Sequence, residues 1–144
     1  MPISIERYQD LSLLSERDRD DLYKIYQEAP SWMFAGEAPE GFVERKLANN
    51  PGELFVARFN DRLLGSCWLI EDQGAMRIKW LTVRKTTRRR GVARQMIDYL
   101  RHEFCDQRLL LSCKQNSATD FLMDHCQFVK IGPEGERVLW AYPL

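Results

Sequence analysis

The fold is decided by one stretch of the sequence, Val83-Arg84-Lys85-Thr86-Thr87-Arg88-Arg89-Arg90-Gly91-Val92-Ala93-Arg94. A mostly apolar stretch from Ala75 to Val83, which follows a turn signal at Gln73-Gly74, leads into it and predicts a strand. Apolar residues at helical spacing follow, from Gly91 to Phe104, and predict a helix. The stretch is therefore a basic loop that joins the end of a strand to the first turn of a helix.

Elementary physical chemistry makes this loop a site for an anion. The first backbone N–H groups of a helix have no intrahelical partner, and the helix dipole adds partial positive charge there. Gly91 lets the backbone approach a phosphate closely, and Ala93 keeps the same surface low. The neighbouring arginines add charge-assisted hydrogen bonds.

A basic run by itself is not specific to a phosphate site. Arg88-Arg89-Arg90 would also fit a solvated surface or a nucleic-acid patch. The chain as a whole carries 21 basic and 21 acidic residues, which argues against nucleic acid as a partner. The strand–loop–helix setting favours a phosphate site.

Outward from the loop, apolar runs and turn signals predict a mixed α+β fold around one sheet. The predicted strands cover residues 3–8, 54–59, 63–70, 75–83, 109–111 and 138–142, and the last of these is expected to close the sheet. The predicted helices cover residues 15–29, 42–47, 91–104 and 117–126, with a loop at 31–41. We expect one domain spanning residues 1–144.

The composition of the chain argues against membrane and metal-binding functions. No apolar stretch approaches the length that crosses a bilayer, so we expect no membrane partner and a cytoplasmic location. The four cysteines are far apart in the sequence and only two histidines are present, so we expect reduced, buried thiols and no metal site.

The basic loop resembles the coenzyme A loop of the GNAT N-acetyltransferase superfamily, which reads Arg/Gln-x-x-Gly-x-Gly/Ala. Arg88, Gly91 and Ala93 match this motif in register. Leu81-x-Val83 is similar to the family's splayed strand, and Asn116 followed by a helix and Phe128 is similar to its closing motif. The resemblance implies the GNAT fold, a mostly antiparallel central sheet with a splayed strand pair and flanking helices.

The same resemblance implies acetyl-coenzyme A as substrate or ligand, and no metal. It implies that backbone amides from Arg89 through Arg94 hold the pyrophosphate, while Leu81 and Val83 align the pantetheine arm. The full set of implied coenzyme contacts is Leu81, Thr82, Val83, Arg88, Arg89, Arg90, Gly91, Val92, Ala93, Arg94 and Asn116.

The sequence departs from the enzymes of the superfamily at two positions. Many of them carry a glutamate general base where this chain has Lys79, and a tyrosine general acid where it has Met123. The catalytic residues therefore stay unassigned. Other groups that could serve as acid or base are Glu71, Asp72, Tyr99, Cys113 and Tyr142.

Within the superfamily, three segments resemble the PanM/PanZ-type maturation factors of aspartate 1-decarboxylase: residues 15–26, 57–64 and 83–92. Those proteins keep the acetyl-coenzyme A site but act as regulators of the decarboxylase precursor, and they also carry methionine at the tyrosine position. The resemblance implies partner contacts through Arg58, Asn60 and Arg84. Asn60-Asp61 is also a good turn sequence, and Arg58 also fits a solvated strand position.

Two functions remain open at this stage. One is an N-acetyltransferase that acts on a small amine or a protein amine of unidentified nature, and the apolar Trp32-Met33-Phe34 would suit its acceptor pocket. That tract would equally suit a core lid or a partner surface. The other function is an acetyl-coenzyme A-dependent regulator that promotes self-cleavage of the aspartate decarboxylase precursor.

Overall fold

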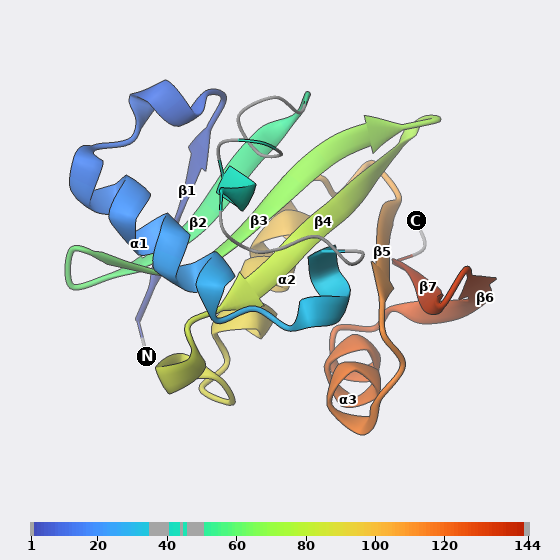
Figure 1. Cartoon of the computed structure of the whole chain (residues 1–144). Coiled ribbons are helices and arrows are strands. Elements are labelled where there is room, and N and C mark those ends of the chain that lie inside the picture. The colour runs from blue at the N-terminus through green and yellow to red at the C-terminus, as the bar shows by residue number, and fades with distance from the viewer. Residues whose placement is uncertain (1, 35–40, 44, 46–50, 143–144) are drawn as a thin grey trace.

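The computed structural model describes residues 2–34, 41–43, 45 and 51–142, and a single twisted sheet runs through it (Figure 1). The strands are β1 (Ser4–Tyr8), β2 (Glu53–Phe59), β3 (Arg62–Asp72), β4 (Ala75–Val83), β5 (Leu109–Cys113), β6 (Val129–Glu134) and β7 (Arg137–Tyr142). Their order across the sheet is β1-β2-β3-β4-β5-β7-β6. Among these described strands only β4 and β5 pair in parallel, and every other neighbouring pair is antiparallel.

Within the described residues, three α-helices flank the sheet: α1 (Glu16–Gln27), α2 (Val92–Glu103) and α3 (Ser117–His125). Short 3-10 helices occupy η1 (Leu11–Leu13), η2 (Ser31–Phe34) and η4 (Lys85–Thr87). Because β4 runs parallel to β5, a crossover is needed between them, and the basic loop with α2 provides it. This confirms the predicted α+β class.

The sheet is buried on both faces, and alternation along β2 shows how. Leu54 and Val56 pack into a core with α1 and η2, whereas Phe55 and Ala57 pack into a second core with α2 and α3. The first core is sealed by Leu22, Ile25 and Tyr26 of α1. The second core takes up the apolar stripe of α2, which is why the spacing of that stripe in the sequence predicts the helix.

The parallel pair β4 and β5 is joined only at its beginning. Met76, Arg77 and Ile78 pair with residues 109–111, and the pairing ends there. From Lys79 onwards β4 continues without β5 beside it in the ladder, while β5 turns into Asn116 and α3. This divergence is the splayed strand pair implied by the resemblance, and it opens the sheet in the middle.

Several sequence predictions need correction. Residues 138–142 do not close the sheet, because β6, which the sequence did not reveal, pairs outside β7 and forms the edge. Residues 31–34, expected as loop, form η2. Cys105 is exposed, although Cys67, Cys113 and Cys126 are buried as expected. Of the helix expected at residues 42–47, residues 42, 43 and 45 are described and are helical, and the other three residues lie outside the described part of the chain.

Candidate functional site

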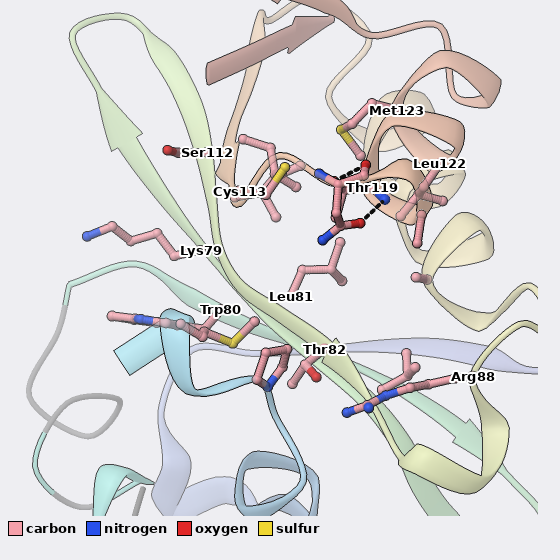
Figure 2. A pocket seen from close by; sticks show the side chains of 18 of the residues that line it. Lys79, Trp80, Leu81, Thr82, Arg88, Ser112, Cys113, Thr119, Leu122 and Met123 are labelled. Atoms are coloured by element: carbon pink, nitrogen blue, oxygen red, sulfur yellow. Dashed lines mark hydrogen bonds between the residues drawn. The ribbon is translucent and has the colours of Figure 1, made fainter. Parts of the chain in front are cut away.

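A cleft of about 1280 Å³ lies where β4 and β5 diverge. Its lining comes from η2, β4, the basic loop, the first turn of α2, the end of β5 and α3. Figure 2 shows Arg88 at one end of the cleft and Lys79 at the other, with Met123 and Thr119 on the opposite side from Leu81. The predicted coenzyme residues that line it are Leu81, Thr82, Val83, Arg88, Arg89, Gly91, Val92, Ala93, Arg94 and Asn116.

The helix start at Gly91 has the geometry expected of a phosphate site. Gly91 is the N-cap of α2 with φ +81°, a left-handed conformation that favours glycine, and a Cβ built on it would meet no atom within 4 Å. Its carbonyl accepts from the Gln95 N–H at 3.0 Å, so the helix begins here. Arg90 is exposed and is not among the lining residues, so its coenzyme contact stays a prediction.

The loop is fixed to the end of α1 by Glu28, a residue that the sequence did not single out. Its carboxylate accepts from the Arg84 side chain at 3.0 and 3.1 Å and from the Lys85 N–H at 2.7 Å. Arg88 also donates to the Glu28 carbonyl. The Arg84 guanidinium holds the pKa of the Glu28 carboxyl below its usual range. Residues 56 or more positions apart make these contacts, and no local pattern links them.

The open edge of β4 presents backbone groups to the cleft. The Arg84 N–H donates to Leu64 of β3 at 2.7 Å, so Arg84 and, by alternation, Thr82 turn their backbone groups towards β3. Leu81 and Val83 therefore turn theirs towards the side that β5 has left. This is the arrangement that an extended pantetheine arm would need.

A β-bulge interrupts β4 at the middle of the cleft. Ser66 pairs with Thr82 and Trp68 with Lys79, so Trp80 and Leu81 together oppose the single residue Cys67. Trp80 has φ +54°, which is strained for a side chain of this size.

Tyr26 of α1 holds the bulge in place. Its hydroxyl donates to the Trp80 carbonyl at 2.9 Å and lies 3.1 Å from Ser66 Oγ. Burial raises the pKa of Tyr26 far above its ordinary value, so the hydroxyl keeps its proton. In a trans peptide the C=O and the following N–H point in opposite directions, so this bond turns the Leu81 N–H into the cleft.

The end of the cleft beyond Leu81 carries Met123, Cys113 and Lys79. Met123 is buried with 1% of its surface exposed, and a thioether has no proton to give. Burial raises the pKa of the Cys113 thiol, so it is a poor source of thiolate. The Lys79 ammonium lies over the Trp80 ring, 5.1 Å from its centroid.

The other possible acids and bases are mostly placed away from the cleft. Tyr99 packs against Phe55 in the core. Tyr142 packs against Phe128 under Arg101. Asp72 is bound to Arg77, and Glu71 is exposed outside the lining.

Asn116 caps α3. Its side-chain oxygen accepts from the Thr119 N–H at 2.9 Å, and the Thr119 hydroxyl accepts from the Asn116 N–H at 3.2 Å. The cap fixes the first turn of α3 against the cleft.

The predicted partner contacts Arg58 and Asn60 lie outside the cleft, near the β2–β3 hairpin. Arg58 makes ion pairs with Asp18 at 2.7 Å and Glu6 at 2.8 Å, and these two carboxylates raise the pKa of its guanidinium. Asn60 is exposed at the turn with φ +48°. Asn60 thus fits its turn role directly, and its role in partner binding stays a prediction, as do those of Arg58 and Arg84.

The described residues contain no group of three or more His, Cys, Asp or Glu that could hold a metal ion. Across the same part of the chain, none of the helices is long and apolar enough to cross a membrane.

Comparison with known families matches residues 2–128 to a family described as "PanZ: Acetyltransferase (GNAT) domain, PanZ". The chain belongs to this GNAT family. The match confirms the resemblance carried by the basic loop, and it covers every element from β1 to the end of α3. A search of curated protein sequences found no match.

Solved structures of other GNAT proteins have the same fold. The ribosomal-protein-S18-alanine N-acetyltransferase from Escherichia coli is 17% identical, covers 99% of this chain and 94% of its own, and gives a TM-score of 0.72. The PaiA N-acetyltransferase from Thermoplasma acidophilum, solved with coenzyme A, is 16% identical over 96% and 98% with a TM-score of 0.69. A GNAT acetyltransferase from Elizabethkingia anophelis with acetyl-CoA bound is 15% identical over 99% and 98%, also with a TM-score of 0.69.

Proposed function

We propose that this protein binds acetyl-CoA in the cleft and, in that bound form, promotes self-cleavage of the aspartate 1-decarboxylase precursor. Binding is supported by the helix start at Gly91, the open edge of β4 and membership of a GNAT family whose structural neighbours hold coenzyme A. The regulatory role is supported by the chemistry of the end of the cleft beyond Leu81, where Lys79, Cys113 and Met123 lie and where the acyl group would bind. We call this part of the cleft the acyl end.

The observation that carries the regulatory role is the pair Lys79 and Met123. At the two positions where GNAT enzymes place a base and an acid, this chain has a cation and a buried thioether. Each missing group removes about 10²–10⁴ in rate from an acyl transfer that relies on it.

The remaining titratable groups of the described lining do not replace them. The Arg77 side chain holds the pKa of Glu134 below its ordinary value, which makes this carboxylate a weak base. His125 lines the cleft and also a smaller pocket that it shares with Arg94, in the first turn of α2 at the end of the cleft near Gly91 (the phosphate end). A protein that only binds and presents acetyl-CoA needs neither an acid nor a base.

N-acetylation of an amine is the second candidate. Aromatic rings gather at the acyl end, where Phe42 packs edge-on against Trp80 with centroids 5.3 Å apart and Trp32 lies nearby in η2. Such a wall suits an apolar acceptor. Positioning next to an activated thioester would then have to drive transfer without acid–base help.

The test uses the purified decarboxylase precursor from the same organism. The precursor is incubated with this protein alone, with acetyl-CoA alone and with both, and chain cleavage is followed by mass spectrometry. A fourth reaction replaces acetyl-CoA by its thioether analogue, which keeps the shape of the ligand but cannot transfer the acetyl group. We expect acceleration with both components, and equally with the analogue.

Each alternative gives a different result. Acceleration by acetyl-CoA but not by the analogue would mean that acetylation of the precursor is the active step. No complex and no acceleration, with acetyl-CoA binding shown by calorimetry, would contradict the regulatory role and leave transfer to an amine, whose acceptor would be found by screening.

A further inference from the structure

Lys79 stands at the point where the cleft ends. It is the first residue of β4 after the last pair with β5, and it is four residues, or about 13 Å along a strand, from Val83 beside the phosphate loop. Figure 2 shows its side chain extending away from Arg88, next to Trp80 and on the same side as Ser112. A thioester whose pyrophosphate lies at Gly91 and whose arm follows β4 would direct its acyl group towards Lys79.

The cationic side chains around this end of the cleft differ in the partners that they have. Arg77 is neutralised by Asp72 and Glu134, each at 3.0 Å. Arg137 donates to the carbonyl of Trp32 at 2.9 Å and lies over that indole ring. Lys79 touches the Trp80 ring, and in the described part of the chain it has no carboxylate within ion-pair distance.

We propose that the acyl end of the cleft is a carboxylate-binding site and that the Lys79 ammonium is the group that binds the carboxylate. The inference rests on the proposed binding of a coenzyme A thioester in the cleft. It adds that the group held beside Lys79, whether it belongs to the acyl chain or to a partner protein, is an anion and not a protonated amine.

The physical reason is the combination of an aromatic wall with a cation that has no carboxylate partner among the described residues. Lys79 is half-buried, so a carboxylate beside it would be less screened than at the surface. A protonated amine would meet like charge there. The ammonium on its flexible stem can donate to a carboxylate that approaches from a range of directions, whereas the planar guanidinium of an arginine requires one geometry.

The carboxylate can be carried by the acyl chain itself, as in malonyl- or succinyl-CoA, or by the partner protein that covers the cleft. The first arm of the test measures calorimetric affinities for acetyl-, propionyl-, malonyl- and succinyl-CoA. We expect malonyl-CoA to bind about tenfold more tightly than propionyl-CoA, a neutral thioester of similar length, and Lys79→Met to remove this preference. Lys79→Arg should retain most of it.

Lys130→Met is the matched control. Lys130 also lies over an indole, that of Trp140 at 5.8 Å, but it is exposed on β6 and outside the cleft. Removing its charge changes the net charge of the protein by the same amount as Lys79→Met. The malonyl preference should survive in Lys130→Met, so a loss there would mean that overall charge, not a site, is responsible.

The second arm saturates the protein with acetyl-CoA and measures binding of the decarboxylase precursor by the wild type and Lys79→Met. No acyl-chain preference, together with precursor binding at least about tenfold weaker in Lys79→Met, would assign the carboxylate to the partner. If neither arm depends on Lys79 while acetyl-CoA still binds, the carboxylate site is overturned and the coenzyme site stands. If no thioester binds at all, the proposed function fails first.

Discussion

At the phosphate end of the cleft, six consecutive residues from Arg89 to Arg94 form the loop end and the first helical turn, whereas the acyl end draws its residues from η2, β4, β5 and α3. The first is backbone chemistry, in which N–H groups and a glycine conformation would do the proposed binding. The second is side-chain chemistry, in which the neighbours Lys79 and Trp80 of β4 line the same cleft as Met123 of α3 only because of the fold.

This difference indicates which part of the cleft can change its chemistry relative to other GNAT proteins by substitution of single side chains. A backbone site tolerates many side chains as long as the turn is kept. At the acyl end a single substitution changes the chemistry, since a glutamate base and a lysine at the same position bind opposite charges. The phosphate end should therefore respond to changes in shape, and the acyl end to changes in charge and hydrogen bonding.

The largest expected effect is at the phosphate end. Gly91→Glu places a carboxylate where the phosphate would bind and should weaken acetyl-CoA binding at least about hundredfold, or about 2.7 kcal/mol. Isothermal titration calorimetry measures it. Gly74→Glu is the matched control, because Gly74 has φ +85° and equally open space around its Cβ but lies at the β3–β4 turn. Both variants bear similar backbone strain of about 1–2 kcal/mol, and unchanged affinity in a folded Gly91→Glu would contradict the assignment of the site.

The next effect concerns the bulge in the middle of the cleft. Tyr26→Phe leaves the Trp80 carbonyl without its donor, so the Leu81 N–H is no longer held towards the cleft. We expect acetyl-CoA binding to weaken about tenfold more than binding of free coenzyme A, in line with about 1–3 kcal/mol for an unsatisfied buried acceptor. Tyr99→Phe, in the core but outside the cleft, should leave the ratio of the two affinities unchanged. If binding of both ligands weakened equally, Tyr26 would have a structural role only.

A smaller effect is expected where the loop is fixed to α1. Glu28→Gln weakens a partly exposed pair with Arg84, so acetyl-CoA affinity should fall about threefold, or about 0.6 kcal/mol. Arg84 depresses the folded-state pKa of Glu28 below 4.5, so its contribution to stability is present above that pH and is lost as pH falls through the folded-state pKa. The stability difference between wild type and variant should stay constant from about pH 5 to 8 and shrink below about pH 4.5. Thermal melts across this range measure it, and a difference that changes around neutral pH would rule out Glu28 as the cause.

The smallest effect is expected from Met123→Tyr. If the protein were an enzyme that lacks only its acid, a tyrosine at this position would raise acetyl transfer by about 10²–10⁴. We expect no increase over background in a thiol-release assay with a panel of amines. Because Met123 is buried, the larger ring can cost about 1–3 kcal/mol, so calorimetry must first show that the variant still binds acetyl-CoA. A clear rise in rate would favour the transferase candidate.

The elements that the sequence predicted correctly are those with an uninterrupted local signal. Strand β4 and helix α2 were predicted almost residue for residue, because β4 is a mostly apolar stretch that follows a turn and α2 has a regular apolar stripe. Strand β6 was missed, because its Val129 and Ile131 are exposed and Gly132 and Pro133 are typical of a turn.

The sequence by itself determined the strand–loop–helix segment at the proposed phosphate end, because the end of the strand, the clustered arginines and the glycine at the helix start are neighbours along the chain. The tertiary structure decided the rest. Glu28 meets Arg84, Tyr26 meets Trp80 and Arg58 meets Glu6 and Asp18 across 40 to 56 residues of chain. The packing of α1 against the sheet decides which side chains pair over such distances. No periodicity in the sequence predicts these pairs.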